Sequence, residues 1–359
     1  MATANSNPTT PVRKGEDLDW PVLERHLKSV LPHLEGEAEI SQFSGGKSNL
    51  TYRLKYANDD LVVRRPPFGA KAKSAHSMIR EYRIMTELKP AYASLPETLY
   101  YSDDESIIGS EFYVMRKVDG LLIGNQIPAE WNFTEEDTRR FCTGFWEKLI
   151  ELHQVDPVAA GLGDFGKPEG YAERQVLGWN RRFERVITPD VDHFTDVREW
   201  LVASLPVESK RHSVLHGDFR IDNVILDRQN PSNILAVLDW EICALGDPLM
   251  DLGNSLAYWI QEDDPVEIRQ LLVQPSNAPG MLTRSEILDL YQERTGIDTS
   301  DFTFYLVYGY WRLAVILQQI YFRFYHGQTQ DVRFSTFGKA AQRLGQHCQE
   351  LISASQPGT

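Results

Sequence analysis

The spacing of apolar side chains divides this chain into a strand-rich first third and a helical remainder. Over residues 50–56 apolar and polar side chains alternate with a period of two, which predicts a half-buried strand. Residues 58–60, Asn-Asp-Asp, favour a turn, and residues 61–65 predict the returning strand of a hairpin. Helical patterns occupy residues 21–34 and 77–88, and short strands are expected at residues 98–101, 107–108 and 112–118.

After Asp119-Gly120 the apolar positions follow the period of an α-helix. The first of these helices is expected to begin at Thr134, because Thr134-x-x-Asp137 is a capping pattern. Two short apolar runs flank a polar stretch and predict a small hairpin, and the chain is expected to be helical from there to about residue 354. The helices are expected at 134–153, 172–186 and 197–205, and the hairpin strands at 224–226 and 234–238.

These patterns predict an α+β protein with two lobes. A small, antiparallel, β-rich lobe is expected over residues 19–118, a hinge over 119–124, and a larger, mostly helical lobe over 125–359. Residues 1–18 are expected to form a disordered lead-in, since they are polar and lack the apolar core of a secretory signal. Residues 302–325 are very apolar, but Arg312, Gln318 and Arg323 interrupt them, which favours a buried helix over one that spans lipid.

Charge and cysteine content limit the partners and the compartment. The 359 residues include 37 Lys and Arg against 51 Asp and Glu, a net charge of −14. This charge disfavours nucleic-acid and anionic-membrane surfaces, yet it leaves room for a local basic site that binds one small anion. Cys142, Cys243 and Cys348 form no C-x-x-C pair, which indicates a reduced, cytoplasmic protein without disulfides or a thiolate zinc site.

A glycine-rich segment, residues 44–48 (Ser-Gly-Gly-Lys-Ser), invites comparison with a P-loop. A P-loop needs a glycine at position 41, where this chain has Ser41, and it needs a helix where residues 50–56 are patterned as a strand. A glycine-rich turn between antiparallel strands is the way a kinase covers ATP phosphates with backbone N–H groups. An ordinary hairpin turn remains the alternative.

The clearest chemical signal is the segment 216–223, His-Gly-Asp-Phe-Arg-Ile-Asp-Asn, followed sixteen residues later by Asp239-Trp240. Asp218 and Asn223 stand five residues apart, and Asp239 ends the second strand of the expected hairpin. One carboxylate that deprotonates a hydroxyl, together with an Asn and an Asp that hold Mg²⁺, would serve phosphoryl transfer. The alternative is a turn followed by a helix cap.

On these residues the chain resembles the aminoglycoside phosphotransferase and choline kinase superfamily, whose bilobal fold is related to that of protein kinases. The resemblance runs from about Glu37 to at least Trp259. Segments 216–223 and 64–67 (Arg-Arg-Pro-Pro) resemble the branch that is fused to acyl-CoA dehydrogenases. The other matching segments are 43–49, 61–64, Glu81, 112–115, Asp239-Trp240 and 246–252.

The resemblance implies an ATP- and Mg²⁺-dependent kinase in which Asp218 is the catalytic base and Asn223 and Asp239 are the metal ligands. Asp251 would brace the catalytic loop. By the same resemblance the nucleotide would be bound by Gly45, Gly46, Ser48, Asn49, Arg64, Glu81, Met115, Arg116 and Val118.

One position departs from the family pattern, because Arg64 stands where the ATP-binding strand normally has a lysine. Arginine keeps the positive charge and can hold phosphate oxygens, but its planar fork differs from a point-charge ammonium. Glu81, on the following helix, is its expected partner. Arg220, two residues after Asp218, is hypothesised to stabilise charge on the transferred γ-phosphoryl group.

The acceptor is expected to be a small molecule with a hydroxyl group. Residues 301–359 hold three acidic and five basic side chains, and ten aromatic residues lie between Phe302 and Tyr325. This favours a less cationic, partly apolar acceptor, although the aromatic residues could equally be core. The resemblance suggests a hydroxyacyl-CoA; an aminoglycoside kinase and a nucleotide-binding pseudokinase module are the alternatives. A protein kinase is disfavoured because no long activation segment follows Asp239.

Overall fold

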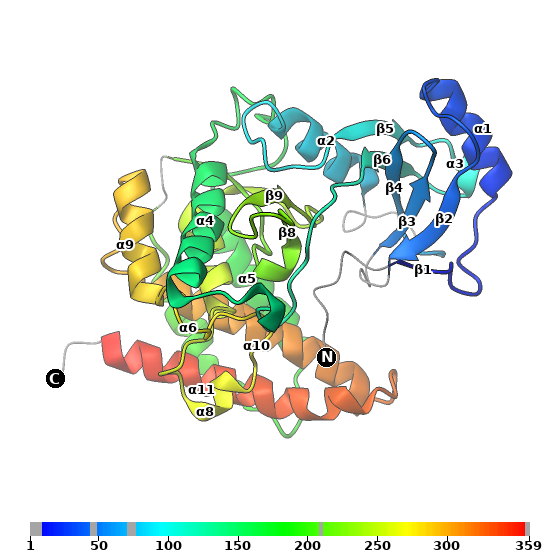
Figure 1. The fold of residues 1–359 in the computed structure, drawn as a ribbon. Helices are drawn as coiled ribbons and strands as arrows, with labels where there is room; N and C mark the ends of the chain where they lie inside the picture. Colours follow the sequence, from blue (N-terminus) through cyan, green and yellow to red (C-terminus); the bar gives the residue numbers. More distant parts are fainter. Residues whose placement is uncertain (1–8, 44–48, 70–76, 208–210, 356–359) are drawn as a thin grey trace. The chain divides into compact units, whose positions relative to one another are not determined.

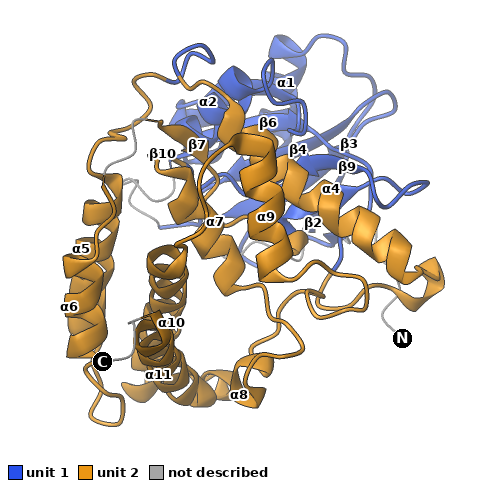
Figure 2. Cartoon of the chain, turned by 90° about the vertical axis from the view of Figure 1, so that its left-hand side faces the viewer, with its two compact units in different colours: residues 1–123, 158–162, 223–243 blue, residues 124–157, 163–222, 244–359 orange. Residues whose placement is uncertain are grey.

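The computed structural model describes residues 9–43, 49–69, 77–207 and 211–355. These residues form two compact units (Figure 1; Figure 2). Unit 1 comprises residues 1–123, 158–162 and 223–243, and unit 2 comprises 124–157, 163–222 and 244–359. The hairpin at 224–237 belongs to unit 1 by its contacts, whereas the sequence predicted it in the second lobe. The expected lobe boundaries stay a prediction.

Unit 1 is built on a six-stranded sheet with the strand order β1-β2-β3-β4-β6-β5. All neighbouring strands are antiparallel, and the hairpin of β3 and β4 pairs in the register Leu50 with Arg65 through Lys55 with Asp60. The strands are β1 Thr9–Thr10, β2 Glu39–Phe43, β3 Leu50–Lys55, β4 Asp60–Arg65, β5 Thr98–Ser102 and β6 Phe112–Arg116.

Helices lie against both faces of this sheet (Figure 1). On one face, Leu23 and Leu27 of α1 (Trp20–Val30) share a buried cluster with Tyr52 and Val114 of the strands. Residues of α3 (Glu105–Ile108) join the same cluster. Alternate residues of a strand face opposite sides of the sheet, so Tyr113 faces the other side, where it contacts α2 (Met78–Leu88).

The small hairpin of unit 1 consists of β8 (Val224–Leu226) and β9 (Ile234–Val237). It is tied to the rest of the unit by main-chain hydrogen bonds between Leu121 and Leu226, and by one from the Val237 N–H to the Ser94 carbonyl. The hairpin therefore carries the residues that follow it, Leu238 to Cys243, into unit 1.

Unit 2 is mostly helical, with one two-stranded antiparallel sheet of β7 (Ser213–Leu215) and β10 (Ala244–Gly246). Its helices α7 and α10 cross with their backbones in contact, because a Cβ on Gly253 would lie 2.4 Å from the Tyr305 carbonyl oxygen. The α-helices are α4 Glu135–Gln154, α5 Tyr171–Glu184, α6 Thr195–Ala203, α7 Pro248–Ala257, α8 Val266–Arg269, α9 Arg284–Thr295, α10 Thr303–Tyr325 and α11 Phe337–Ser355. The 3-10 segments are Ala129–Trp131, Ile221–Asn223, at the boundary between the units, and Val332–Thr336.

The elements agree with the sequence predictions in most places, with several differences. Residues 9 and 10, within the expected disordered lead-in, form β1 and pair with β2, and residues 244–246, within the stretch expected to be helical, form β10. The first helix ends at Val30 rather than at residue 34, and residues 107–108 belong to the short helix α3, capped by Asp104 and Gly109, rather than to a strand. Residues 258–283 contain only the short helix α8, where a longer helical run was expected. The capping pattern at Thr134 is confirmed, since its side chain accepts from the Asp137 N–H. Within the described ranges no helix is both long enough and apolar enough to cross a membrane.

Candidate active site

The segment His216-Gly217-Asp218 leaves β7 and is held by Asp251 of α7. One oxygen of the Asp251 carboxylate accepts from the His216 N–H at 2.7 Å, and the other accepts from the Gly217 N–H at 2.8 Å. His153 of α4 lies 3.2 Å from the same carboxylate. Burial raises the pKa of Asp251, but His153, His216 and these hydrogen bonds outweigh it and bring that pKa below its usual range. A buried ionised carboxylate therefore fixes the backbone that presents Asp218.

Asp218 itself is partly exposed, with 22% of its side chain accessible. Its carboxylate lies 3.4 Å from the Arg220 Nε, and the Arg220 Nη2 lies 3.0 Å from Asp222. The next residue, Phe219, is buried and packs against Phe145 of α4 with ring centroids 4.5 Å apart and the rings tilted by 32°. Phe219, an apolar residue of this polar segment, thus anchors the loop in the core, while the side chains of Asp218 and Arg220 stay partly exposed.

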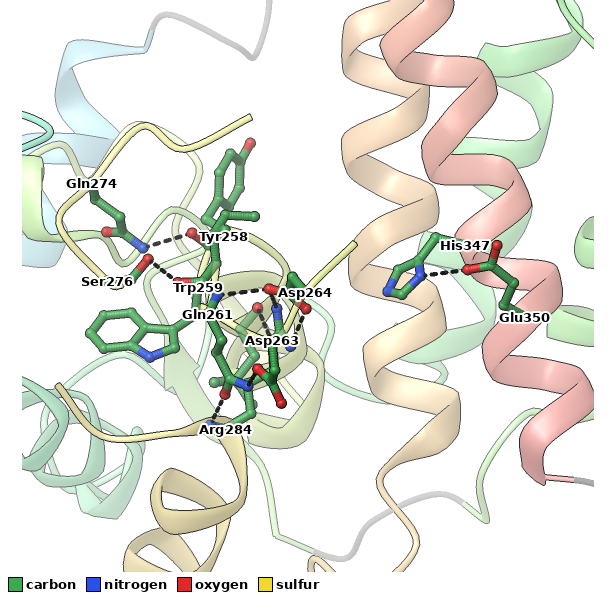
Figure 3. A network of polar contacts seen from close by, with 12 residues as sticks. Tyr258, Trp259, Gln261, Asp263, Asp264, Gln274, Ser276, Arg284, His347 and Glu350 are labelled. Atoms are coloured by element: carbon green, nitrogen blue, oxygen red, sulfur yellow. Dashed lines mark hydrogen bonds and ion pairs between the residues drawn. The ribbon is translucent and has the colours of Figure 1, made fainter. Parts of the chain in front are cut away.

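A second support reaches this loop from the segment that follows α7. The side chain of Gln274 accepts from the Ile221 N–H at 2.9 Å and donates to the Tyr258 carbonyl at 3.1 Å (Figure 3). The Tyr258 ring in turn lies 5.0 Å from the Arg220 guanidinium. The loop is therefore held by Asp251 of α7 and, through Gln274, by the segment that follows α7.

The segment that carries Gln274 is stabilised by its own polar network (Figure 3). Arg284 makes two hydrogen bonds with the buried carboxylate of Asp264, at 2.9 and 2.6 Å. Asp264 also accepts from the Gln261 N–H at 2.7 Å, and the Ser276 hydroxyl donates to the Ile260 carbonyl at 2.8 Å. These contacts give a long connection without regular structure a fixed course.

In unit 1, Arg64 lies within a group of carboxylates. Its guanidinium lies 3.1 Å from Glu81, 2.9 Å from Asp239 and 3.5 Å from Glu241. Burial by itself would lower the pKa of Arg64, but Tyr113, Glu81 and Asp239 raise it well above its usual value. Arg64 therefore stays charged, and the expected pairing of Arg64 with Glu81 is present.

Asn223 and Asp239 are brought next to one another by the β8–β9 hairpin. The N–H of Leu238, the neighbour of Asp239, donates to the Asn223 carbonyl at 2.8 Å. Asp239 adopts a left-handed backbone conformation with φ of 67°, which is uncommon for a residue other than glycine. One amide oxygen and one carboxylate are hard donors that suit Mg²⁺ when phosphate oxygens and water complete its shell, so this donor set fits the metal.

The other predicted nucleotide residues have mixed outcomes. Gly45, Gly46 and Ser48 lie outside the described residues. The Asn49 amide donates to Glu81 at 3.1 Å and to Glu241 at 3.2 Å, so its side chain is committed to the Arg64 cluster. Met115 and Arg116 end β6, and Val118 follows; the Arg116 side chain pairs with Asp59 and Glu97.

Sequence reasoning missed three residues around these sites. Glu241 contacts Arg64 and Asn49, Gln274 supports the loop that carries Asp218, and Arg312 of α10 donates from Nη2 to the Gly217 carbonyl at 3.0 Å. Arg312 did carry a signal, since it interrupts a very apolar helix. Gln274 carried none, because a glutamine in an irregular segment has no pattern that marks it.

Comparison with known proteins places the chain in a family. The model of the phosphotransferase enzyme family matches residues 39–286, which is more than half of the chain. The chain belongs to this family, and both the predicted resemblance and the predicted α+β fold class are confirmed. The matched residues include the Asp218 loop, Asn223 and Asp239.

Curated relatives carry the names of dehydrogenases. The chain is 34% identical to mouse acyl-CoA dehydrogenase family member 10 over 341 residues, covering 94% of this chain and 31% of that protein. It is 32% identical to chicken acyl-CoA dehydrogenase family member 11 over 354 residues, covering 96% of this chain and 44% of that protein. The chain therefore spans less than half the length of these relatives.

Solved structures have the same fold. A protein of Ralstonia eutropha, proposed to be an aminoglycoside phosphotransferase, superposes with a TM-score of 0.81 and 28% identity, covering 95% of this chain and all of that one. A choline kinase of Cryptosporidium parvum gives a TM-score of 0.58 at 12% identity, covering 94% of this chain and 96% of that one, which is a likeness of fold alone.

Proposed function

We propose that this protein transfers the γ-phosphoryl group of Mg·ATP to a hydroxyl group of a small molecule. The observation that carries the proposal is the loop of unit 2 in which Asp251 accepts the N–H groups of His216 and Gly217 and thereby fixes the two residues directly before Asp218. A partly exposed carboxylate on a fixed loop suits a general base.

The residues of the candidate site each have a role in this proposal. Asp218 orients the acceptor hydroxyl and takes its proton, and Arg220 offsets negative charge on the transferred phosphoryl group. In unit 1, Arg64, held by Glu81, contributes a positive charge toward the triphosphate. Asn223 and Asp239 would hold Mg²⁺, which when bound neutralises phosphate charge.

Names of similar proteins support the use of a nucleotide. Variants of an aminoglycoside phosphotransferase of similar fold were solved with hygromycin B and either ADP or AMP-PNP, whereas another protein of similar fold was solved with GDP and kanamycin. We propose ATP for this chain and treat GTP as the comparison nucleotide. The acceptor is proposed to be a hydroxylated metabolite, with a hydroxyacyl-CoA as the first candidate because the curated relatives are named for acyl-CoA dehydrogenases.

Two alternatives have observations in their favour. An aminoglycoside kinase is favoured by the proposed identity of the Ralstonia protein. A nucleotide-binding module without catalysis is favoured by Arg64, which replaces the usual lysine and already contacts three carboxylates. The module has no need of a general base, so the response to removal of Asp218 separates it from an enzyme.

The test measures phosphate transfer from ATP by the full chain to a panel of 3-hydroxybutyryl-CoA, kanamycin and choline. Thermal stabilisation by ATP is measured in parallel, with and without Mg²⁺. For an enzyme, Asp218→Asn lowers turnover by about 10²–10⁴-fold and keeps the magnesium-dependent shift. Stabilisation without turnover on any acceptor would indicate the module, and turnover on kanamycin alone would indicate the antibiotic kinase.

A further inference from the structure

Arg312 is a buried cation beside the catalytic loop. It lies in the middle of α10 with only 8% of its surface exposed, and its Nη2 donates to the carbonyl of Gly217, the residue before Asp218. An arginine has five N–H donors. Throughout residues 9–43, 49–69, 77–207 and 211–355, Arg312 makes this one hydrogen bond and no salt bridge, so its other donors have no protein acceptor there.

The surroundings of Arg312 are aromatic rather than acidic. The Trp179 ring centroid lies 5.4 Å from its guanidinium carbon, and Trp179 is itself half-buried. Burial alone would lower the pKa of Arg312, but Tyr258, Tyr308 and Asp218 raise it, so the side chain remains charged. Aromatic faces attract a cation without neutralising it.

A second arginine in the same unit, Arg220, does have carboxylates in contact with it. Arg220 lies over the Tyr258 ring and contacts the carboxylates of Asp218 and Asp222 at 3.4 and 3.0 Å. Arg312 also acts electrostatically on Tyr258 and Asp218, but no carboxylate lies within 4 Å of it among the described side chains. The two acids of the loop are thus engaged by Arg220 rather than by Arg312.

A buried charge without a contacting counter-ion is unfavourable, so its presence beside a catalytic loop calls for a ligand that completes it. We infer that Arg312 binds an anionic group, a carboxylate or a phosphate, on the acceptor whose hydroxyl approaches Asp218. The planar guanidinium can offer two parallel N–H groups to either anion. This inference rests on the proposed function, and it narrows the acceptor to acidic molecules and disfavours polycationic drugs.

The competing explanation is that Arg312 serves only to hold the Gly217 carbonyl. That role would affect every acceptor equally, whereas an anion site distinguishes an acid from a neutral molecule of the same shape. The test therefore compares matched pairs: 3-hydroxybutyrate with its methyl ester, and glycerol 3-phosphate with glycerol. The first pair reports on carboxylates and the second on phosphates.

The primary readout is binding, which does not require turnover. Thermal stabilisation of the full chain by each probe is measured in the presence of Mg·AMP-PNP, and kcat/KM is measured wherever phosphate is transferred. In the wild type, at least one acid is expected to bind about tenfold or more tightly than its neutral partner. Arg312→Gln, which keeps a donor for Gly217, is expected to bring this ratio near one, and Arg312→Lys is expected to retain part of it.

Arg182→Gln is the matched control, because Arg182 is exposed and lies 4.5 Å from the same Trp179 ring. The ratio of acid to neutral binding by this variant is expected to equal that of the wild type. Equal binding of acid and neutral partner by the wild type would overturn the inference, as would a uniform loss for all four probes in both Arg312 variants. Failure of the proposed function has a different signature, namely no transfer of phosphate from Mg·ATP to any acceptor, whatever the ratio of acid to neutral binding.

Discussion

Two arginines, Arg64, which is half-buried in unit 1, and Arg312, which is buried in unit 2, are balanced in opposite ways. Arg64 contacts Glu81, Asp239 and Glu241, so among these four described side chains one positive and three negative formal charges meet, 1 − 3 = −2. Arg312 contacts a backbone carbonyl and an aromatic ring, and no salt bridge to a described residue neutralises it. The first cluster has an excess of negative charge, and the second site has an excess of positive charge.

The difference indicates which ligand each region can accept. An excess of carboxylates beside Asn223 suits a divalent cation, and a desolvated guanidinium suits an anion. Both regions belong to a chain whose net charge is −14. Net charge describes the surface that a partner meets, whereas the sign at a buried site depends on a few contacts.

The largest expected effect comes from removing each arginine in turn. Arg64→Met leaves Glu81, whose side chain is 2% exposed, without its cation, and should lower the free energy of unfolding by about 3–5 kcal/mol. Arg312→Met leaves one carbonyl without its donor, but no described carboxylate within 4 Å loses a counter-ion. The free energy of unfolding should therefore fall by about 1–3 kcal/mol. Urea unfolding measures both.

The control for this pair is Arg53→Met, because Arg53 and Asp60 form a partly exposed ion pair in unit 1. A cost of about 1 kcal/mol or less is expected there. Equal losses of unfolding free energy for Arg64→Met and Arg312→Met would contradict the difference in charge balance between the two arginines.

The next effect tests the negative cluster. With Mg·ATP at about 100 times its Kd, the wild type should gain about 2.7 kcal/mol of stability. Asp239→Asn should lose most of the magnesium-dependent part of this gain, because it removes one carboxylate donor. Asp227→Asn is the control, since that side chain serves the hairpin turn by accepting from the Gln229 N–H. A full magnesium response in Asp239→Asn would remove Asp239 from the metal site.

A smaller effect concerns the support of the catalytic loop in unit 2. Gln274→Met leaves the buried Ile221 N–H without its acceptor and should cost about 1–3 kcal/mol. It should also lower kcat while nucleotide binding stays unchanged, since the variant disturbs the loop alone. Ser276→Ala, which loses one bond to the Ile260 carbonyl in the same segment, is the control. A kcat equal to that of the control would leave Gln274 with a purely structural role.

The smallest effect is a pH dependence in α11, where a histidine is buried without full compensation. Burial lowers the pKa of His347, while its contact with Glu350 opposes this and nearby Arg343 adds to it. The unfolded chain therefore takes up this proton first as pH falls below about 6.5, so His347 removes stability progressively below that pH. His347→Gln should flatten the stability profile there, and the exposed His193→Gln should not; identical profiles for all three proteins would contradict the prediction.

Local pattern predicted the fold best where one element could be judged alone. Residues 50–55 form a strand as their alternation requires, and Thr134 caps α4 as predicted. Residues 107–108 were wrongly predicted as a strand, because two apolar positions are too few to show a periodicity. Asp104 and Gly109 cap the two ends of the short helix that forms there instead. Residues 258–283 follow a mostly irregular course, and their polar groups find partners within the segment, in the adjoining Arg284 and in Ile221.

Motifs and elements adjacent in the chain were enough to predict the family, the loop of Asp218 and the pairing of Arg64 with Glu81. The folded chain was needed to see that Glu241 joins Arg64, that Gln274 holds Ile221 and that Arg312 reaches Gly217 with no acidic partner among the described residues. The reason is physical: the charge balance and hydrogen bonding of a buried group are set by neighbours that come from distant parts of the chain, and no local pattern records them.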